Sequence, residues 1–350
     1  MGKTMGHLKL YPSVIRPMVN ALSLFDGERA HQEALFFLRL CGLPPIRQML
    51  SACTFIRNER TVFGVKFPNP VGAAAGFDKR GVALYGLEGF GFGFAEVGTV
   101  TPLPQPGNPK PRLFRLTEDE AIINRMGFNN DGAVALADRM SHYRGFGIPI
   151  GINIGKNKDT PIEQAADDYE KCITALYQYA DYFTINVSSP NTKDLRQLQE
   201  KSRLEGLLGR VQQRMRESSK GQRPKPVLLK IAPDVSPEEL HDILEVSESR
   251  VQGLIIHNTT VARPDTLRSS HREEAGGLSG KPLQKRAVEL VDTVHRALPN
   301  MPIVGVGGIF GPEDALRLFD AGASLVQLYT GLVFEGPLLA YRINRALIKT

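Results

Sequence analysis

From about residue 60 onward, short apolar runs alternate with longer segments whose apolar residues recur at helical spacing. The short runs predict buried strands, and the longer segments predict helices. We expect strands at 71–75, 94–98, 148–154, 181–187, 227–231, 253–257, 303–306 and 325–329. We expect helices near 79–89, 131–143, 161–178, 201–218, 236–248, 282–297, 312–320 and 337–347.

Strict alternation of eight strands and eight helices predicts an α/β fold in which a parallel sheet closes into a (β/α)8 TIM barrel. An open doubly wound sheet is the competing architecture. That sheet carries a glycine fingerprint after its first strand, and residues 72–76 lack its spacing.

The first part of the chain has a different pattern, because apolar residues at helical spacing predict amphipathic helices within residues 12–53. A break is expected at 26–28 and a second one at 42–45, with a short third helix after it. One apolar face of the first helix is formed by Val14, Ile15, Met18, Val19 and Leu22. We divide the chain into a helical segment, 1–55, and a barrel domain, 56–350. The helices either cap the barrel or lie in a membrane surface, which an apolar face with basic flanks favours.

Polar or glycine residues follow every predicted strand, and in a barrel all of these strand ends meet on one face. They are Gly76, Asp78, Lys79, Gly98, Thr99, Asn153, Gly155, Lys156, residues 186–192, Lys230, His257, Asn258, Thr259, Gly307, Gly308, Tyr329, Thr330 and Gly331. Three long loops, 99–130, 187–200 and 258–281, interrupt the barrel, and long loops on a rigid scaffold are usually functional. We therefore expect an active site at this face.

The sequence after the fourth strand, Asn-Val-Ser-Ser-Pro-Asn-Thr at 186–192, is nearly all polar or small. It suits a loop that presents hydroxyls and amides to a ligand, and it also suits a turn that caps the next helix. Glycines 307 and 308, together with Tyr329 and Thr330, lie where barrels commonly bind phosphate.

Lys230 ends an apolar strand, so its ammonium group is expected to meet an anion or to act chemically. A Schiff base, a cation beside an electron-accepting ring and a structural salt bridge all remain open. One cation and several amides suit a small, planar anion rich in amide groups. The residues that supply this cation and these polar groups are Lys79, Asn124, Asn186, Asn191, Asn258 and Thr259.

Composition adds limits to this interpretation. The three cysteines are far apart and form no metal or disulfide pattern, which indicates a reducing compartment. The net charge is +6, and residues 1–60 hold eight Lys/Arg against four acids. These basic residues are interleaved with apolar ones and lack a set of stacking aromatics, which argues against nucleic acid. We expect no transmembrane helix and no secretory signal.

Eight stretches of the chain closely resemble the dihydroorotate dehydrogenase family, in its quinone-dependent, membrane-associated class 2. The stretches are Ala74–Lys79, Glu96–Pro102, Asn124–Asn130, Gly151–Asn157, Asn186–Thr192, Lys230–Asp234, Gly276–Pro282 and Gly305–Ile309. The resemblance implies a barrel that uses FMN to oxidise dihydroorotate to orotate in pyrimidine biosynthesis and passes the electrons to a membrane quinone.

The resemblance also implies roles for individual residues. Ser189 would be the base that removes the C5 proton, while the C6 hydride goes to flavin N5. The substrate would be held by Lys79, Asn124, Arg125, Met126, Gly127, Phe128, Asn186, Asn191, Asn258 and Thr259. FMN would be held by Ala75, Gly76, Phe77, Asp78, Lys79, Thr99, Asn153, Asn186, Lys230, His257, Gly280, Gly308, Tyr329 and Thr330. No metal is implied.

The serine base and the N-terminal helices favour class 2 over the soluble class 1, which uses cysteine. In class 2 the helices form a tunnel for quinone, so we expect a monomer bound peripherally to the membrane, on the cytoplasmic face of the inner membrane in a bacterium. His257 departs from the family, which usually has threonine there, and we expect its backbone to suffice for the FMN contact. A pyrimidine-reducing flavin barrel, a Schiff-base lyase and a non-catalytic scaffold are the alternatives.

Overall fold

The computed structural model describes residues 27–349, and in it eight parallel strands close into the barrel that the alternating pattern predicts. Around the barrel the strands follow the order β10-β12-β13-β3-β4-β7-β8-β9. Their bounds are β3 (Val71–Ala73), β4 (Phe94–Val100), β7 (Ile150–Ile154), β8 (Tyr182–Asn186), β9 (Val227–Lys230), β10 (Gly253–Ile256), β12 (Ile303–Val306) and β13 (Leu325–Leu328). Each strand lies within two residues of its predicted start and end.

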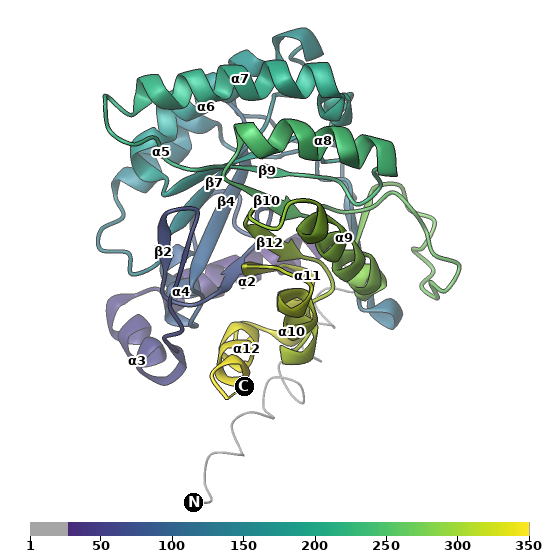
Figure 1. The fold of residues 1–350 in the computed structure, drawn as a ribbon. Coiled ribbons are helices and arrows are strands. Elements are labelled where there is room, and N and C mark those ends of the chain that lie inside the picture. Colours follow the sequence, from purple (N-terminus) through teal and green to yellow (C-terminus); the bar gives the residue numbers. More distant parts are fainter. Residues whose placement is uncertain (1–26, 350) are drawn as a thin grey trace, which may run out of the picture.

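The helices surround the barrel, with α6, α7 and α8 along one side of it in Figure 1. Their bounds are α4 (Leu84–Gly89), α5 (Ala133–Ser141), α6 (Ala165–Leu176), α7 (Lys201–Ser218), α8 (Pro237–Arg250), α9 (Gln284–Ala297), α10 (Pro312–Asp320), α11 (Thr330–Glu335) and α12 (Leu339–Leu347). Short 3₁₀ helices are η3 (Thr117–Asp119), η4 (Ile162–Gln164), η5 (Tyr177–Tyr179), η6 (Leu195–Gln199) and η7 (Lys281–Leu283). The pattern did not predict α11.

The helix predicted at 79–89 begins only at Leu84, because the preceding backbone is engaged in a turn. The carboxylate of Asp78 accepts hydrogen bonds from the backbone N–H groups of Val82 and Ala83, at 2.9 and 2.7 Å. A side-chain acceptor that holds these N–H groups replaces the regular helical bonds at this point.

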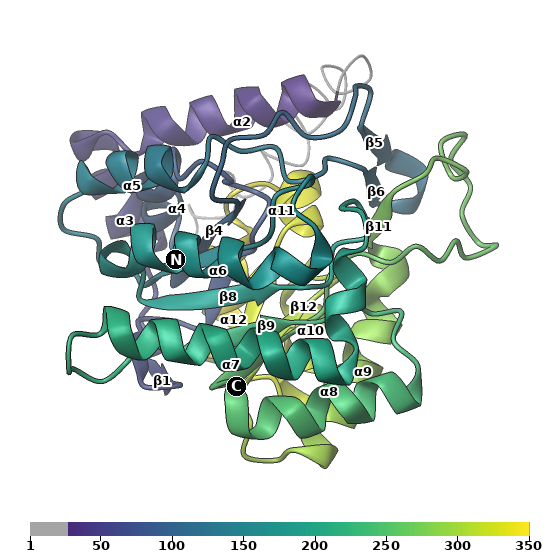
Figure 2. The same cartoon turned by 90° about the horizontal axis from the view of Figure 1, so that it is seen from above.

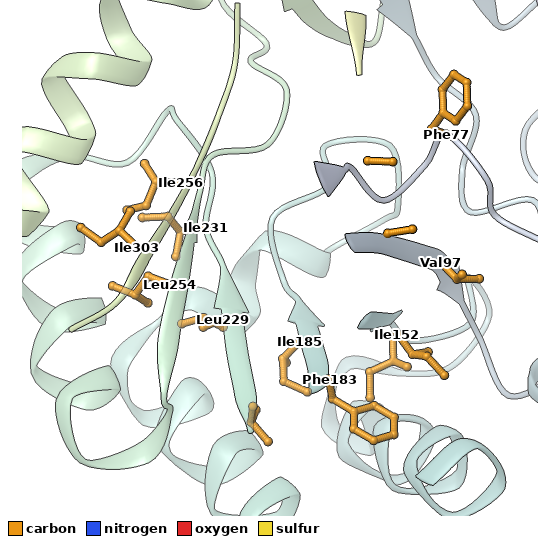
Figure 3. Close-up of a cluster of buried hydrophobic side chains, with 14 of the residues drawn as sticks. Phe77, Val97, Ile152, Phe183, Ile185, Leu229, Ile231, Leu254, Ile256 and Ile303 are labelled. Atoms are coloured by element: carbon orange, nitrogen blue, oxygen red, sulfur yellow. The ribbon is translucent and has the colours of Figure 1, made fainter. Parts of the chain in front are cut away.

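The main hydrophobic core lies between the strands and the helices around them (Figure 3). Alternate residues of each strand, such as Ile152 on β7 and Phe183 and Ile185 on β8, point into this layer and are fully buried. Because the other face of each strand fills the barrel, both faces are buried. This explains the nearly continuous apolar runs in the sequence.

A hairpin that the sequence pattern did not predict, β1 (Arg60–Val62) and β2 (Val65–Phe67), packs on the aromatic core inside the barrel. The ring of Phe67 is fully buried and lies edge-on to Phe94, with 5.2 Å between the ring centroids. Tyr182 lies 6.4 Å from Phe67 in the same cluster. The hairpin precedes β3 and so covers the amino ends of the strands, which leaves their carboxyl ends for a ligand.

Two of the three expected long loops contain a small antiparallel sheet instead of irregular chain alone. It is formed by β5 (Leu113–Leu116), β6 (Ala121–Asn124) and β11 (Gly277–Gly280), in the order β11-β6-β5. Asn124 pairs with Gly277, 153 residues further along the chain. Four-residue strands joined over such a distance leave no local alternation that a sequence pattern could detect.

The N-terminal segment contributes α2 (Gly27–Cys41) and α3 (Pro44–Thr54), and α2 runs along one side of the barrel in Figure 2. The helix contacts α4 and β5. Its first turn is anchored by a buried ion pair in which Arg112 donates to both oxygens of Glu28, at 2.8 and 2.9 Å. The helix predicted before residue 26 lies outside the described residues. Within residues 27–349, no helix combines the length and the hydropathy that a membrane span requires.

Candidate functional site

A cavity opens at the carboxyl ends of the barrel strands, beneath the small sheet formed by β5, β6 and β11, and its empty space, open mouth included, is about 990 Å³. Nineteen of the residues to which the family resemblance assigned a role line it: Ala75, Gly76, Lys79, Thr99, Asn124, Met126, Gly127, Phe128, Asn186, Ser189, Asn191, Lys230, His257, Asn258, Thr259, Gly280, Gly308, Tyr329 and Thr330. Gly307 and Gly331, singled out for their places after strands, line it as well.

Four other predicted site residues do not line this cavity. Phe77, Asp78 and Asn153 are buried behind its wall, where Asp78 holds the turn before α4. The side chain of Arg125 turns outward, because its guanidinium donates to Glu274 at 2.7 Å and lies 4.5 Å from the centroid of the Phe114 ring. The neighbours of Arg125 in the sequence, Asn124 and Met126, line the cavity. The side chain of Arg125 itself packs on Phe114 of the small sheet.

The loops after β12 and β13 approach each other so closely that glycine is required. A Cβ atom added to Gly331 would lie 1.8 Å from the carbonyl oxygen of Ile309. Gly308 has φ +67°, a conformation that side chains rarely adopt, and an added Cβ would meet Gln284 at 2.3 Å. Bare backbone therefore faces the cavity between these two loops, and such a surface suits close contact with a phosphate group.

Lys79 provides a positive charge on the opposite wall of the cavity. Its ammonium donates to the side-chain oxygen of Asn129 at 3.0 Å. Burial lowers the pKa of Lys79 to about 8, and the nearby charge of Arg112 lowers it further while Glu28 opposes the shift. A bound anion would favour the charged form and raise this pKa.

Lys230 is 5% exposed and lines the cavity at the end of β9. Burial lowers the pKa of this lysine, and the negative charge of Glu96 opposes the shift. Among residues 27–349, none forms an ion pair with Lys230 within 4.0 Å. The ammonium is therefore available to an electron-rich group of a ligand.

The amide side chains in and behind the cavity wall form two hydrogen-bonded groups. Asn186 donates to the hydroxyl of Thr99 at 2.9 Å, and Thr99 donates to Asn153 at 2.5 Å. Near the cavity mouth, Asn191 donates to both oxygens of Asn124, at 3.0 and 3.3 Å. These bonds fix the orientation of the amides before a ligand arrives, which lowers the cost of binding.

The hydroxyl of Ser189 lies in the cavity wall with 6% of the residue exposed. Its oxygen accepts a hydrogen bond from the backbone N–H of Asn191 at 3.3 Å. The serine is thus held in place by the loop that its own sequence forms. The second serine, Ser188, is fully buried and instead donates to Asn186 at 3.1 Å.

His257 is 1% exposed, and burial lowers its pKa to about 4. Its Nδ1 atom bonds to the carbonyl oxygen of Asn258, while Nε2 has no partner among the described residues. The ring packs beside Gly307 and near Ala287 of α9. The imidazole is therefore neutral near pH 7.

Several cavity residues were missed by the reasoning from sequence: Ala74, Ser279, Leu283, Val306, Ile309, Gln327 and Leu328. A signal existed for Gln327, because it is a polar residue inside the otherwise apolar strand β13. Within the described part of the chain, no three His, Cys, Asp or Glu side chains are grouped in a way that could hold a metal ion.

Comparison with known proteins agrees with this architecture. The sequence model of the family described as dihydroorotate dehydrogenase matches residues 58–350. A protein named dihydroorotate dehydrogenase (quinone) from Christiangramia forsetii is 49% identical over 346 residues, which cover 97% of this chain and 99% of that protein. One of the same name from Chloroflexus aurantiacus is 50% identical over 344 residues and 95% of each chain.

Solved structures give the same result at lower identity. A ligand-free dihydroorotate dehydrogenase from Eimeria tenella superposes with a TM-score of 0.83 at 38% identity, over 93% of this chain and 94% of that one. The same protein in complex with ferulenol has a TM-score of 0.78 at 37% identity, over 87% and 89% of the two chains.

Proposed function

Because this chain belongs to the dihydroorotate dehydrogenase family, we propose that it oxidises (S)-dihydroorotate to orotate with FMN as hydride acceptor and a membrane quinone as final electron acceptor. Family membership supports the reaction, its place in pyrimidine biosynthesis and the use of quinone. The identity of the flavin and the roles of individual residues rest on the geometry of the cavity.

The cavity fits FMN at both ends of that molecule. The bare backbone of Gly308 and its neighbours, between the loops after β12 and β13, suits the phosphate. Lys230 offers a cation to the flavin ring, and Thr99 and Asn186, which Asn153 holds in place from behind the wall, line the cavity beside it. This pairing of a phosphate cradle with a buried cation is the observation on which the proposal of FMN depends. The chemistry that FMN supplies when bound is acceptance of the C6 hydride at N5 and delivery of electrons to quinone.

The substrate is proposed to lie between the flavin and the small sheet, against Lys79 and the paired amides of Asn124 and Asn191. Lys79 neutralises the carboxylate of the substrate. The amides can match both the N–H and C=O groups of its ring.

Ser189 is proposed to take the C5 proton, since among residues 186–192 it is the residue with a hydroxyl that lines the cavity. The hydroxyl proton of Ser189 passes to solvent as the C5 proton is transferred, and the Asn191 N–H, directed at the Ser189 oxygen, holds that oxygen in position and stabilises its negative charge between the two transfers. A serine needs such support because its own basicity is low.

Quinone is proposed to approach from the side of α2. The ring of His31 on this helix lies edge-on to Phe77, with centroids 5.3 Å apart, and Phe77 lies edge-on to Tyr329 of the cavity wall at 6.1 Å. One aromatic layer therefore separates α2 from the cavity. Burial lowers the pKa of His31 to about 4, so this layer carries no charge near pH 7.

We further propose that α2 and α3 bind the protein peripherally to the membrane, on the cytoplasmic face of the inner membrane in a bacterium. Phe36, Phe37 and Met49 on these helices are 62%, 53% and 62% exposed. Apolar side chains this exposed on neighbouring helices, with Arg39 and Arg47 beside them, are typical of interfacial helices.

The proposed function is tested by an anaerobic visible spectrum of the purified protein, taken before and after addition of dihydroorotate and then of a short-chain ubiquinone. Flavin bands that bleach with substrate and return with quinone are the expected result. Bands that fumarate restores but quinone does not would move the protein to class 1. Absence of flavin after incubation with FMN would overturn the proposal and return attention to Schiff-base chemistry at Lys230.

A further inference from the structure

A buried carboxylate lies inside the barrel beneath the cavity. Glu96 on β4 is 1% exposed, and it is buried among residues of four strands. No role follows for it from the substrate or the chemistry proposed above. An isolated buried charge is costly, so this carboxylate is expected to be surrounded by hydrogen-bond donors.

Four side chains donate hydrogen bonds to Glu96. Asn153 donates to Oε1 at 2.8 Å. Gln327, Thr184 and Tyr182 donate to Oε2 at 2.9, 3.1 and 3.3 Å. A carboxylate offers acceptors only, so each partner must turn a donor toward it.

Because Glu96 must receive donors, it sets the direction of every hydrogen bond between its carboxylate and the cavity. Since Asn153 gives its NH₂ to Glu96, its carbonyl faces Thr99 and Asn186 and accepts from both, at 2.5 and 3.2 Å. Asn186 has then used its NH₂, so its carbonyl accepts from Ser188 and Asn258, at 3.1 and 3.4 Å. Every hydrogen bond in this series therefore donates toward Glu96.

The same requirement orients Gln327. Its NH₂ is held by Glu96, which leaves its amide oxygen buried without a partner among the described residues, in a side chain that lines the cavity. A buried amide oxygen without a donor is unfavourable. It is therefore placed to accept a hydrogen bond from an N–H group of a ligand.

We propose that Glu96 is the positioning residue of the cofactor site, because its carboxylate fixes the orientation of Gln327 directly and that of Asn186 through Asn153, and both of these amides line the cavity that would hold the flavin. This inference rests on the proposed function, in that it takes the ligand to be FMN. Glu96 acts through the amides and does not itself line the cavity.

The test compares FMN affinity, measured by quenching of flavin fluorescence on titration of the apoprotein. Glu96→Gln keeps the shape of the side chain but replaces one acceptor with an NH₂ group, which opposes a donor of its neighbours. We expect the dissociation constant for FMN to rise at least tenfold. Asn153→Asp should also weaken binding, because two carboxylates then face each other.

The decisive variant combines Glu96→Gln with Asn153→Asp. In the pair, the new NH₂ can donate to the new carboxylate, and that carboxylate still accepts from Thr99 and Asn186. The remaining oxygen at position 96 still accepts from Gln327, Thr184 and Tyr182. The direction of the network is restored, so FMN affinity should return to within about threefold of the wild type, a coupling that independent sites do not show.

The matched control is Tyr182→Phe, which removes one donor from the same carboxylate but leaves the bond to Asn153 intact. It should lower the melting temperature without changing FMN affinity more than threefold. Wild-type affinity in Glu96→Gln, or a double variant no better than the singles or unable to fold, would overturn the role of Glu96. A wild-type protein that binds no flavin would instead overturn the proposed function, and this inference with it.

Discussion

At the scale of single residues, the site depends on groups whose protonation or orientation is set by burial. Ser189 is held by a backbone N–H, Lys79 is a partly desolvated cation, and Lys230 is buried without an ion-pair partner among the described residues. What distinguishes them is that the barrel brings all three to one cavity.

Ser189→Ala should slow reduction of the flavin by dihydroorotate by about 10²- to 10⁴-fold, the usual contribution of a general base. Stopped-flow absorbance of the flavin measures this step directly. Orotate affinity should change less than threefold, since the hydroxyl is not a principal binding group. Ser189→Cys keeps a proton-accepting atom and should retain more activity than alanine. Equal rates for the alanine variant and the wild type would exclude the serine as base.

Binding of orotate should weaken above pH 8. The free protein has a Lys79 pKa of about 8, and the anion needs the charged ammonium. The apparent dissociation constant should therefore be flat below this pH and rise up to about tenfold per unit above it. Spectral titration of the bound flavin with orotate gives the constant. Lys79→Met should bind weakly at every pH, and a slope that persists in this variant would assign the titration to another group.

At the scale of elements, the segment formed by α2 and α3 has two faces. One face docks on the barrel through Glu28 and contacts α4 and β5, while the other exposes Phe36, Phe37 and Met49. Docking and the proposed membrane binding therefore involve different residues and can be altered separately.

The double variant Phe36→Glu/Phe37→Glu should abolish most binding to phospholipid vesicles and slow turnover with a long-chain quinone. Flavin reduction by dihydroorotate should stay within twofold of the wild type, because neither side chain lines the cavity. Vesicle sedimentation and the two half-reactions provide the measurements. Val134→Glu is the control, since it places a charge on an apolar side chain that is 75% exposed on another helix. Vesicle binding that survives in the double variant would contradict an interfacial role for α2.

Glu28→Gln should release α2 from the barrel, since it leaves Arg112 buried without its carboxylate partner. Loss of one member of a buried pair typically costs about 3–5 kcal/mol. Hydrogen exchange of residues 27–54 measures the docking. Glu33→Gln on the same helix removes an ion pair with Arg29 whose side chains are 45% and 78% exposed, and it should cost at most about 1 kcal/mol. Similar exchange in both variants would refute an anchoring role for Glu28.

The ion pair between Glu28 and Arg112 also predicts that α2 is released from the barrel in acid. The hydrogen bond from Arg112 lowers the pKa of Glu28 below its ordinary 4.5. A depressed carboxyl pKa contributes stability that is complete above the ordinary value and is lost as the pH falls through the folded-state value. Exchange of residues 27–54 should therefore accelerate below pH 4.5 in the wild type, after correction for the intrinsic rate, and much less in Glu28→Gln.

At the scale of the whole molecule, the cavity draws residues from the ends of seven of the eight barrel strands, all but β7, and from the small sheet, while the hairpin packs within the core at the opposite end. A ligand that contacts so many elements stabilises the barrel as a unit. The aromatic core beneath it gives the rigid floor on which the amides are held.

FMN should raise the melting temperature of the apoprotein by about 4 °C when its concentration is 100 times the dissociation constant. Linkage gives about 2.7 kcal/mol at this ratio, and the entropy of unfolding for a chain of this size converts that figure to the temperature shift. Differential scanning calorimetry measures it. Riboflavin, which lacks the phosphate, should give a much smaller shift at the same concentration. An equal shift would argue against a phosphate site at Gly308.

Local pattern alone determined the eight barrel strands, most of their helices and the face on which the polar residues gather. It could do so because strands buried on both faces leave continuous apolar runs, and because barrel topology sends all carboxyl ends to one side. Asn186, Ser189 and Lys230 were identified in this way. The family resemblance added their individual roles, which remain predictions for the experiments above.

Only the tertiary structure decided the rest. Asn124 and Gly277 pair across 153 residues, so the small sheet over the cavity has no local signature. Arg125 lies in the stretch 124–130, which resembles the family, yet its side chain contacts Glu274 and Phe114 and points away from the cavity. The direction of the amide network depends on Glu96 meeting donors from three other strands. Such contacts join residues remote in sequence, and their energy exists only once the barrel has closed.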